Sequence, residues 1–400
     1  MRFFSALTLC FLYVGISAQN TYVPDDSFEQ YLIWLEMDDV LDDSVLTANI
    51  VDVQSLHLGY SSIHDLTGLE GFLSLDSLTI SELQNIDMSY LDMSLVPWLK
   101  YLDCYNQNGQ IDSINLSQNT ALQFLDASGN SITSLDLSNN TLLEHLGCNF
   151  NQISDLDLSN NLLLKGISVD HNNLTSLDLA LNDSLYALGC SWNAITELDL
   201  SNKPNLEFVF CYHNTLSVLE LNNTPELVRL WCSDNQISEL DVLNKPNLEQ
   251  LFAGDNLLTS LDLSSCGSLI WIWLNSNQLY ELNVANGLNT YMAGFPGGGI
   301  EYIPDFTDNP DLTCITVDDV AHCTEWWNTE GYPIFNNPNG YVSIDSTMYF
   351  SANCSSVSVD DISPFSVLTY PNPASHHITV YLGDLSGLKS SMQMYDASGR

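Results

Sequence analysis

The side chains that could catalyse a reaction do not gather in a recognisable motif. The chain of 400 residues has eight histidines and ten cysteines, scattered along its length. It lacks the Gly-x-Ser-x-Gly, His-Glu-x-x-His and glycine-rich loop motifs that position a nucleophile, a zinc ion or a nucleotide phosphate. Paired carboxylates occur only in periodic series, which the period itself explains without a mechanism. We therefore expect that the protein is not an enzyme.

Acidic residues recur every 21 residues, and hard oxygen ligands of this kind suit calcium. The candidate metal ligands are Asp157, Asp178, Asp199, Glu220, Asp241 and Asp262, with Asp136 before them and Asn283 after them. Unit charges about 5 Å apart repel by roughly 0.8 kcal/mol even in water, and a cation would relieve that repulsion. We favour the alternative of a solvated acidic face that keeps the protein in solution, because the nonapeptide pattern of calcium-binding β-rolls is absent. No other cofactor is expected.

Aromatic residues recur with the same spacing later in this periodic region. In one series, Asp126, Gly147, Ser168 and Gly189 are followed by Phe210, Trp231, Phe252 and Trp273. A second series, two positions earlier, runs Phe124, His145, Gly166, Ala187, Phe208, Arg229, Gln250 and Trp271. Each member flanks an aliphatic residue in an alternating stretch, so these side chains are expected to point outward from a strand.

The aromatic series has a functional and a structural interpretation. Large exposed apolar patches usually mark contact sites, and Trp and Arg dominate binding hot spots. The candidate ligand-binding residues are Phe208, Phe210, Arg229, Trp231, Phe252, Trp271 and Trp273. A smaller series, Phe150, His171, Trp192 and His213, would extend this surface. In the structural interpretation, residues 287–339 cover the rings, or the rings stack only to stiffen a sheet.

The spacing of all these series comes from a 21-residue repeat in the middle of the chain. Its first leucine recurs at Leu122, Leu143, Leu164, Leu185, Leu206, Leu227, Leu248 and Leu269. The unit LxxLxCxxNxIxxLDLSxNxx resembles the short bacterial class of leucine-rich repeat and covers residues 99–288. Its two alternating stretches predict two short strands per turn, stacked in parallel about 4.8 Å apart. The expected fold is a mainly β solenoid of the α/β leucine-rich-repeat type.

Two inward series are expected to serve the core. One consists of Asn130, Asn151, Asn172, Asn193, Asn214, Asn235, Asn256 and Asn277. A buried amide at each bend would pair with backbone groups that otherwise lack partners, so we interpret these residues as a structural ladder. The other consists of Cys104, Cys148, Cys190, Cys211 and Cys232, whose place other repeats fill with Ala127, Val169, Ala253 or Leu274. Such exchange indicates small core residues, and no Cys-x-x-Cys zinc spacing is present.

The solenoid needs a cap at each end. Residues 19–98 are expected to form an N-terminal cap and irregular repeats, with Asp26 and Glu29 as a capping box that opens a helix over residues 28–35. Residues 289–354 are the expected C-terminal cap, because segments 308–319 and 349–354 resemble the closing segment of secreted proteins of this repeat class. That resemblance implies a Cys314–Cys354 disulfide, with Cys314–Cys323 as the alternative pairing.

Both ends of the sequence indicate export. Residues 1–18 have one early positive charge, a short apolar run and small residues before residue 19, as in a signal peptide. After a linker at 355–365, residues 366–400 resemble the start of the C-terminal sorting domain of type IX secretion cargo, through Tyr-Pro-Asn-Pro-Ala-Ser at 370–375 and the strand and turn at 394–400. The resemblance implies a partial β-sandwich that the outer-membrane machinery recognises. This sequence stops at Arg400, where the family continues, so we expect either a fragment or an incomplete signal.

The overall charge excludes several partners. The chain has 8 Lys and Arg against 50 Asp and Glu, a net charge of −42, so it cannot present a basic surface to nucleic acid. No apolar run is long enough to span a bilayer. We expect a secreted or outer-surface protein that recognises an extracellular protein or glycan, or mediates adhesion, through the aromatic face. The alternative is a passive structural surface protein with an acidic, calcium-binding face. The sequence does not identify the ligand, the oligomeric state, or whether the protein stays anchored.

Overall fold

A computed structural model describes residues 19–58, 63–80, 89–105, 111–289, 304–327, 344–345 and 348–354. All of them belong to one compact unit, Met1–Cys354. The predicted signal peptide, linker and sorting domain lie outside the described residues, as do 290–303 and 328–343 of the predicted C-terminal cap. None of the described helices is long and apolar enough to cross a membrane.

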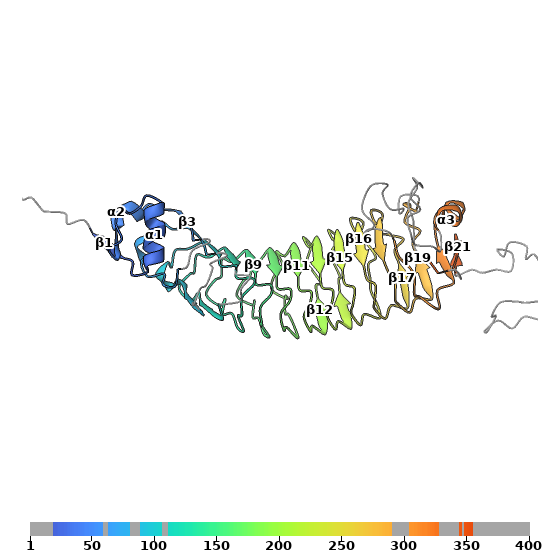
Figure 1. The fold of residues 1–400 in the computed structure, drawn as a ribbon. Coiled ribbons are helices and arrows are strands. Elements are labelled where there is room, and N and C mark those ends of the chain that lie inside the picture. Colours follow the sequence, from blue (N-terminus) through green and yellow to red (C-terminus); the bar gives the residue numbers. More distant parts are fainter. Residues whose placement is uncertain are drawn as a thin grey trace, which may run out of the picture. The chain divides into compact units, whose positions relative to one another are not determined.

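The first stretch of each repeat forms a three-residue strand, and these strands build one parallel sheet of 11 strands. Their chain order is β3 (Ser55–His57), β4 (Ser77–Thr79), β6 (Tyr101–Asp103), β8 (Phe124–Asp126), β9 (His145–Gly147), β10 (Gly166–Ser168), β11 (Ala187–Gly189), β13 (Phe208–Phe210), β15 (Arg229–Trp231), β16 (Gln250–Phe252) and β18 (Trp271–Trp273). From β8 onward every residue pairs with the residue 21 positions later, as Phe210 does with Trp231. The sheet follows one side of the stacked turns (Figure 1).

The second stretch of each repeat lies on the opposite side, where regular strands are fewer than the repeat predicts (Figure 1). The strands there are β5 (Tyr90–Asp92), β7 (Ser113–Asn115), β12 (Glu197–Asp199), β14 (Val218–Glu220), β17 (Ser260–Asp262), β19 (Glu281–Asn283), β20 (Cys314–Thr316) and β21 (Tyr349–Ser351). Segments 135–137, 156–158, 177–179 and 240–242 form no strand. The expectation of two strands in every turn is therefore wrong for these turns. Side-chain hydrogen bonds shape the chain there, as the acidic residues described below show.

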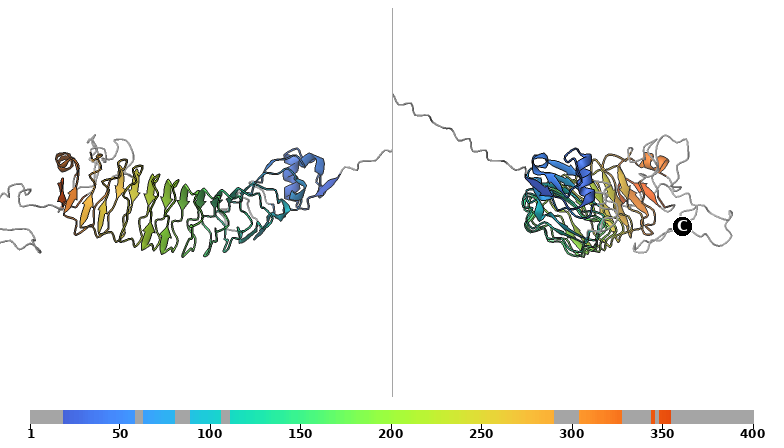
Figure 2. Two further views of the ribbon diagram at one scale, coloured as in Figure 1. Left: turned by 180° about the vertical axis from the view of Figure 1, so that it is seen from behind. Right: turned by 60° about the vertical axis from the view of Figure 1, so that its left-hand side comes forward.

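Short helices lie at both ends of the stacked turns, and a pair of antiparallel strands lies at the N-terminal end (Figures 1 and 2). At the N-terminal end, β1 (Asn20–Tyr22) pairs antiparallel with β2 (Ser44–Leu46), next to α1 (Asp26–Trp34) and α2 (Thr47–Ile50). Two 3-10 turns follow, η1 (Leu69–Gly71) and η2 (Met93–Leu95), and α3 (Val320–Trp326) lies near the C-terminal end.

The helix α1 begins two residues earlier than the predicted helix over residues 28–35, and its N-cap lies one residue before the predicted Asp26. Asp25 is the N-cap, and its side chain accepts a hydrogen bond from the Phe28 backbone N–H at 2.9 Å. Glu29 is buried, and it accepts hydrogen bonds from the backbone N–H groups of Asp42, Asp43 and Ser44. The predicted reciprocal pair of Asp26 and Glu29 is therefore wrong, because Glu29 orders the approach to β2 instead.

The core is a column of aliphatic side chains lined by asparagine amides. The middle residue of each strand of the large sheet from β8 to β18 is at most 3% exposed. Asn172 is typical of its series: its Nδ2 donates to the carbonyls of Cys148 at 2.9 Å and Val169 at 3.1 Å, and its Oδ1 accepts from the Ile153 N–H at 3.0 Å. The same pattern recurs from Asn130 to Asn277. Each turn is thus hydrogen-bonded to its neighbour through a buried amide.

A second buried ladder, which sequence reasoning missed, lies at the other bend. Its members are Asn119, Asn140, Asn161, Asn182, Lys203, Thr224, Lys245 and Cys266. The Asn140 amide donates to the Leu116 carbonyl, and Lys245 Nζ donates to the equivalent Leu221 carbonyl at 2.9 Å. Burial lowers the pKa of Lys245, against the opposing influence of Asp241. The asparagines, Lys245 and Cys266 donate to carbonyls of the preceding turn, Cys266 through its thiol. Thr224 instead donates to the Leu221 carbonyl of its own turn, and Lys203 forms an ion pair with Asp183.

Candidate binding face

The aromatic cluster occupies the outward positions of β13, β15, β16 and β18. The rings of Phe210 and Trp231 meet edge to face at 4.9 Å between centroids. Trp231 stacks on Phe252 at 5.0 Å, and Phe252 stacks on Trp273 at 4.3 Å. Phe208, Phe210, Trp231, Trp271 and Trp273 are each partly exposed. The structure therefore brings one predicted series together as a continuous row of rings along the sheet.

Phe252 differs from the expectation that the whole series is exposed. Only 6% of its surface is accessible, because the flanking rings of Trp231 and Trp273 cover both of its faces. Its neighbour Gln250 is also buried and accepts a hydrogen bond from Trp231 Nε1 at 3.1 Å. Trp231 and Trp273 are therefore the partly exposed members of this part of the row, and Phe252 lies between them.

Arg229 lies in the second predicted series, beside Phe208. Its guanidinium carbon is 5.5 Å from the centre of the Phe208 ring, a cation–π contact. Phe208 also meets Tyr186 edge to face at 6.5 Å. Arg229 is partly buried, so it positions the edge of the cluster as well as contributing charge to it.

A groove lies beside the aromatic row. Its volume is about 690 Å³. Its lining residues are Tyr212, Trp231, Ser233, Asp234, Phe252, Asp255, Trp273, Asn275 and Asp305. They come from three neighbouring positions of consecutive turns, so no single repeat contains the groove. The rings of Trp231, Phe252 and Trp273 line it together with the carboxylates of Asp234 and Asp255, and Asp305 lies at the end of the aromatic row.

The smaller series, Phe150, His171, Trp192 and His213, forms a second row of stacked rings. Centroid distances along the row are 4.3, 5.1 and 3.8 Å. Phe150 and Trp192 are 57% and 44% exposed. Tyr212 meets His213 at 5.6 Å and also lines the groove, so the two rows adjoin.

All four of these residues have left-handed backbone, with φ between 52° and 56°. The same position is Gly129 before them and Asp234, Asp255 and Ser276 after them, also with positive φ. For a bulky side chain this conformation costs about 1–2 kcal/mol, and ring stacking returns about 0.5–1.5 kcal/mol per pair. Four consecutive turns thus place a ring, exposed at Phe150 and Trp192 and half-buried at His171 and His213, at a position whose backbone conformation disfavours bulky side chains.

In the N-terminal half of the same sheet, the outward series from Asp126 to Gly189 presents small and acidic side chains, next to the rings of Tyr101, Phe124 and His145 in the second series. A Cβ added to Gly189 would lie 2.7 Å from Asp170 Oδ2, and one added to Gly147 would lie 3.0 Å from Asp126 Oδ1. Asp170 accepts hydrogen bonds from the Ser191 N–H at 2.7 Å and from Ser168 Oγ at 3.2 Å. Burial raises the pKa of Asp170 despite these bonds. The glycines leave room for carboxylates that lie flat on the sheet.

The acidic series on the opposite side closes turns. Each Asp of the series accepts a hydrogen bond from the backbone N–H two residues later, as Asp157 does from Ser159 at 2.9 Å. Asn283 makes the same bond to Ala285, and Glu220 instead contacts the Asn222 side chain. Hydrogen bonds from the Ser138, Ser159 and Ser201 positions lower the pKa of Asp136, Asp157 and Asp199. Within the described part of the chain, no three His, Cys, Asp or Glu residues form a group that could hold a metal ion. Calcium binding by this series stays a prediction.

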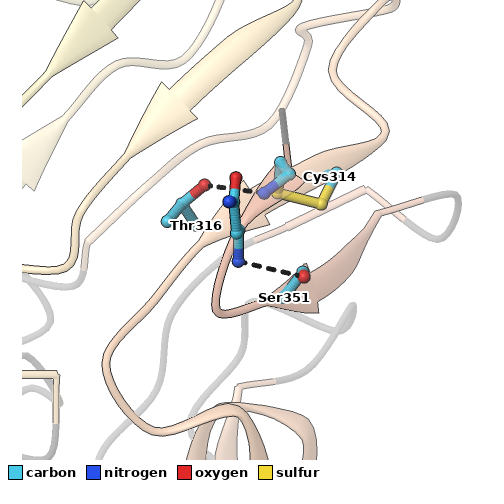
Figure 3. Close-up of a disulfide and its surroundings, with 5 residues drawn as sticks. Cys314, Thr316 and Ser351 are labelled. Atoms are coloured by element: carbon cyan, nitrogen blue, oxygen red, sulfur yellow. Dashed lines mark hydrogen bonds between the residues drawn. A yellow bond between two sulfur atoms is a disulfide. The ribbon is translucent and has the colours of Figure 1, made fainter. Parts of the chain in front are cut away.

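The cysteines fall into two groups. Cys314 and Cys354 form a disulfide, as the resemblance implied, and the alternative pairing with Cys323 is wrong because Cys323 is free and buried (Figure 3). Thr316 Oγ1 accepts from the Cys354 N–H at 3.3 Å beside the bridge. Cys148 and Cys232 are buried, and burial raises the pKa of each thiol to about 12. Thiols that remain protonated are poor nucleophiles and metal ligands, which agrees with a packing role.

Known structures share this fold. No family model and no curated protein matches the sequence. The functional domain of InlJ from Listeria monocytogenes, described as including a cysteine ladder, is 25% identical over 80% of each chain, with a TM-score of 0.50. An internalin, inlF, from Listeria monocytogenes str. 4b F2365 is 18% identical over 85% of this chain and 100% of its own, with a TM-score of 0.53. The chain is a parallel β solenoid with the fold of leucine-rich repeat proteins. Here Cys190, Cys211 and Cys232 likewise occupy one buried position on three consecutive turns.

Proposed function

We propose that this chain is an exported protein that recognises another protein through the aromatic cluster on β13 to β18. One observation carries the proposal: along the outward series that contains Trp273, the residue is small or acidic up to Gly189 and aromatic from Phe210 onward, while the buried residue beside it stays aliphatic. A change that the core does not require has its reason on the outside of the molecule. The fold that the chain shares with internalins supports recognition in kind, since repeat solenoids offer extended contact surfaces.

The arrangement of the rings favours a protein over a glycan. A sugar stacks on an open aromatic face, but the faces of Phe252 are covered by Trp231 and Trp273. What the row presents is a ridge of ring edges about 15 Å long, at about 4.8 Å per turn. Such a ridge fits apolar side chains of a partner, and Trp is a common anchor of protein interfaces.

A binding screen with matched variants tests the proposal. The full chain is screened against arrays of extracellular proteins and of glycans, and hits are measured again with Trp231→Ala and Trp273→Ala. Each substitution should weaken binding of a protein hit by about 2 kcal/mol, roughly thirtyfold. The control is Phe124→Ala, which removes a ring stacked on Tyr101 at 4.2 Å in the other half of the sheet. Equal loss with all three variants, or hits confined to glycans, would contradict the proposal and leave the passive structural role.

Export is tested separately. Charged residues in place of the apolar run at 3–14 should trap the protein in the cytoplasm of its host, because a signal sequence needs an apolar segment. Deletion of residues 366–400 should stop the protein before the outer surface, because the resemblance assigns sorting by the type IX machinery to this segment. Normal surface delivery without residues 366–400 would end the sorting assignment.

A further inference from the structure

The groove beside the aromatic row combines two kinds of surface. Trp231, Phe252 and Trp273 supply ring edges along one wall. Asp234 and Asp255 supply carboxylates on two consecutive turns beside them, and Asp305, which pairs with Trp273, adds a carboxylate at the end of the aromatic row. A volume of about 690 Å³ admits one or two large side chains of a partner.

Two of the groove carboxylates, Asp234 and Asp255, differ from the acidic series on the opposite side, whereas Asp305 accepts a hydrogen bond from the Thr307 backbone N–H at 3.0 Å, as that series does. On the opposite side, Asp157 accepts a hydrogen bond from the Ser159 backbone N–H, and this bond closes its own turn. In the groove, Asp234 and Asp255 occupy the left-handed position, with φ of 55° and 53°, which Asp adopts more readily than most residues. The Asp255 carboxylate contacts the Asn275 amide at 3.4 Å, and Asp234 faces His213 Nδ1 at 3.5 Å. The local fold therefore does not require a carboxylate at either position, since Phe, His, Trp and Ser occupy it in other turns.

The chain itself provides these carboxylates with little positive charge. Lys100, Lys165 and Lys203 pair with acids elsewhere, and Arg229 lies over Phe208. Of the described Lys and Arg side chains, none forms an ion pair with Asp234, Asp255 or Asp305. Negative charge gathered in a groove with low-dielectric walls attracts cations more strongly than an open surface does.

We propose that this groove binds a basic side chain, arginine above all, from the protein partner. The aliphatic stem packs along the ring edges of Trp231 and Trp273, and the guanidinium donates hydrogen bonds to Asp234 and Asp255. Arginine fits better than lysine because its planar group reaches two carboxylates at once and is more weakly hydrated. This inference rests on the proposed function and specifies the chemistry of the partner at that site.

Short peptides provide a direct probe. The full chain is titrated with acetyl-Gly-Arg-Arg-Gly-amide and with the Lys, Gln and Glu counterparts, and binding is followed by tryptophan fluorescence and calorimetry. The Arg peptide should bind most tightly, the Lys peptide less so, and the Gln and Glu peptides not measurably. The double variant Asp234→Asn/Asp255→Asn should weaken Arg-peptide binding by about tenfold, since it removes two charges at contact distance.

A matched variant separates local recognition from the general attraction of an acidic protein. Asp157→Asn/Asp178→Asn makes the same change in net charge on the opposite side and should alter binding less than about twofold. Equal weakening by both double variants would overturn the proposal, as would equal binding of Arg and Gln peptides. A protein hit that depends on Trp231 but not on Asp234 and Asp255 would uphold the proposed function and reject the arginine site. Melting curves of both double variants exclude unfolding as a cause.

Discussion

The two halves of the large sheet have the same backbone and opposite surfaces. Along β9 to β11 the outward position is Gly147, Ser168 and Gly189, and the neighbouring left-handed position carries the rings of Phe150, His171 and Trp192. Along β15 to β18 the outward position is Trp231, Phe252 and Trp273, and the left-handed position is Asp234, Asp255 and Ser276. The rings of these two series thus occupy the left-handed position up to His213 and the outward position from Phe210 onward.

This exchange shows how a repeat separates folding from recognition. The buried leucines and asparagines repeat through both halves, so the strand register and the spacing of turns do not depend on the outward residues. Where one of the two positions carries a ring, the other carries a small or acidic residue, except in the turn of Phe210 and His213, where both carry rings. The rings therefore form an oblique band across the sheet. Asp126 and Asp170 lie on one side of this band, and Asp234 and Asp255 lie on the other.

The largest expected effect concerns the ring that the aromatic half buries. Phe252→Ala should lower the free energy of unfolding by about 3 kcal/mol, because Phe252 is covered on both faces and its loss leaves a gap between two tryptophans. The matched variant Ser168→Ala in the polar half removes hydrogen bonds to Asn149 and Asp170 but leaves no such gap, and should lower it by only about 1 kcal/mol. Urea denaturation of both variants measures the difference. Similar values for the two would mean that the aromatic row adds nothing to the stability of its half.

A somewhat smaller loss of stability is expected in the polar half, where the Asp170 carboxylate leaves no space for a Cβ at Gly189. Gly189→Ala should destabilise the protein by about 2 kcal/mol, because its Cβ would lie 2.7 Å from Asp170 Oδ2 and would disturb the bond to Ser191. Gly267→Ala is the control, since a Cβ there meets nothing within 4 Å. Thermal melts of the two variants compare them. A neutral Gly189→Ala would show that the Asp170 side chain can move aside.

Sequence reasoning was strongest where the period alone decides the structure. A spacing of 21 residues predicts the leucine and asparagine series and the outward direction of the rings. The prediction of one strand in every turn is confirmed for the large sheet but not for the opposite side. The second ladder escaped because Asn182 gives way to Lys203, and a lysine is rarely expected to replace a buried amide. The available signal for this second ladder was a side chain with a hydrogen-bond donor every 21 residues, whether Asn, Lys, Thr or Cys.

Features that depend on neighbouring turns could not be read from one repeat. The burial of Phe252 depends on the rotamers of Trp231 and Trp273, and the groove depends on three positions in separate turns. Positive φ at Phe150 and Trp192 was hidden because aromatic residues rarely adopt it. Gly129 and the aspartates at the same position in other turns were the available signal, and only an alignment of the repeats within this chain makes it visible.

A difference in the sign of the pH response separates the sheet from the opposite side. Burial raises the pKa of Asp170 above its ordinary value of 3.8, so the folded chain binds this proton more tightly than the unfolded chain does. Relative to Asp170→Asn, the wild type should lose stability as the pH rises from below 3.8 through the raised pKa. Asp157 has a lowered pKa, so relative to Asp157→Asn the wild type should gain stability as the pH rises through the range below 3.8. Unfolding curves between about pH 3 and pH 7 measure both, and equal signs would contradict this assignment.

The smallest effect is expected from calcium on the acidic series of the opposite side. Six of its seven acidic members already accept a backbone hydrogen bond that closes a turn, and Asn283 does the same without any charge. Turn closure thus accounts for the recurring Asp, and millimolar Ca²⁺ should raise the melting temperature no more than NaCl of equal ionic strength, through screening alone. A larger shift with Ca²⁺ that disappears in Asp157→Asn/Asp178→Asn would instead establish a metal site by ligand linkage. That outcome would make the opposite side a second functional surface, and the contrast between the halves of the sheet would no longer be the main division of the molecule.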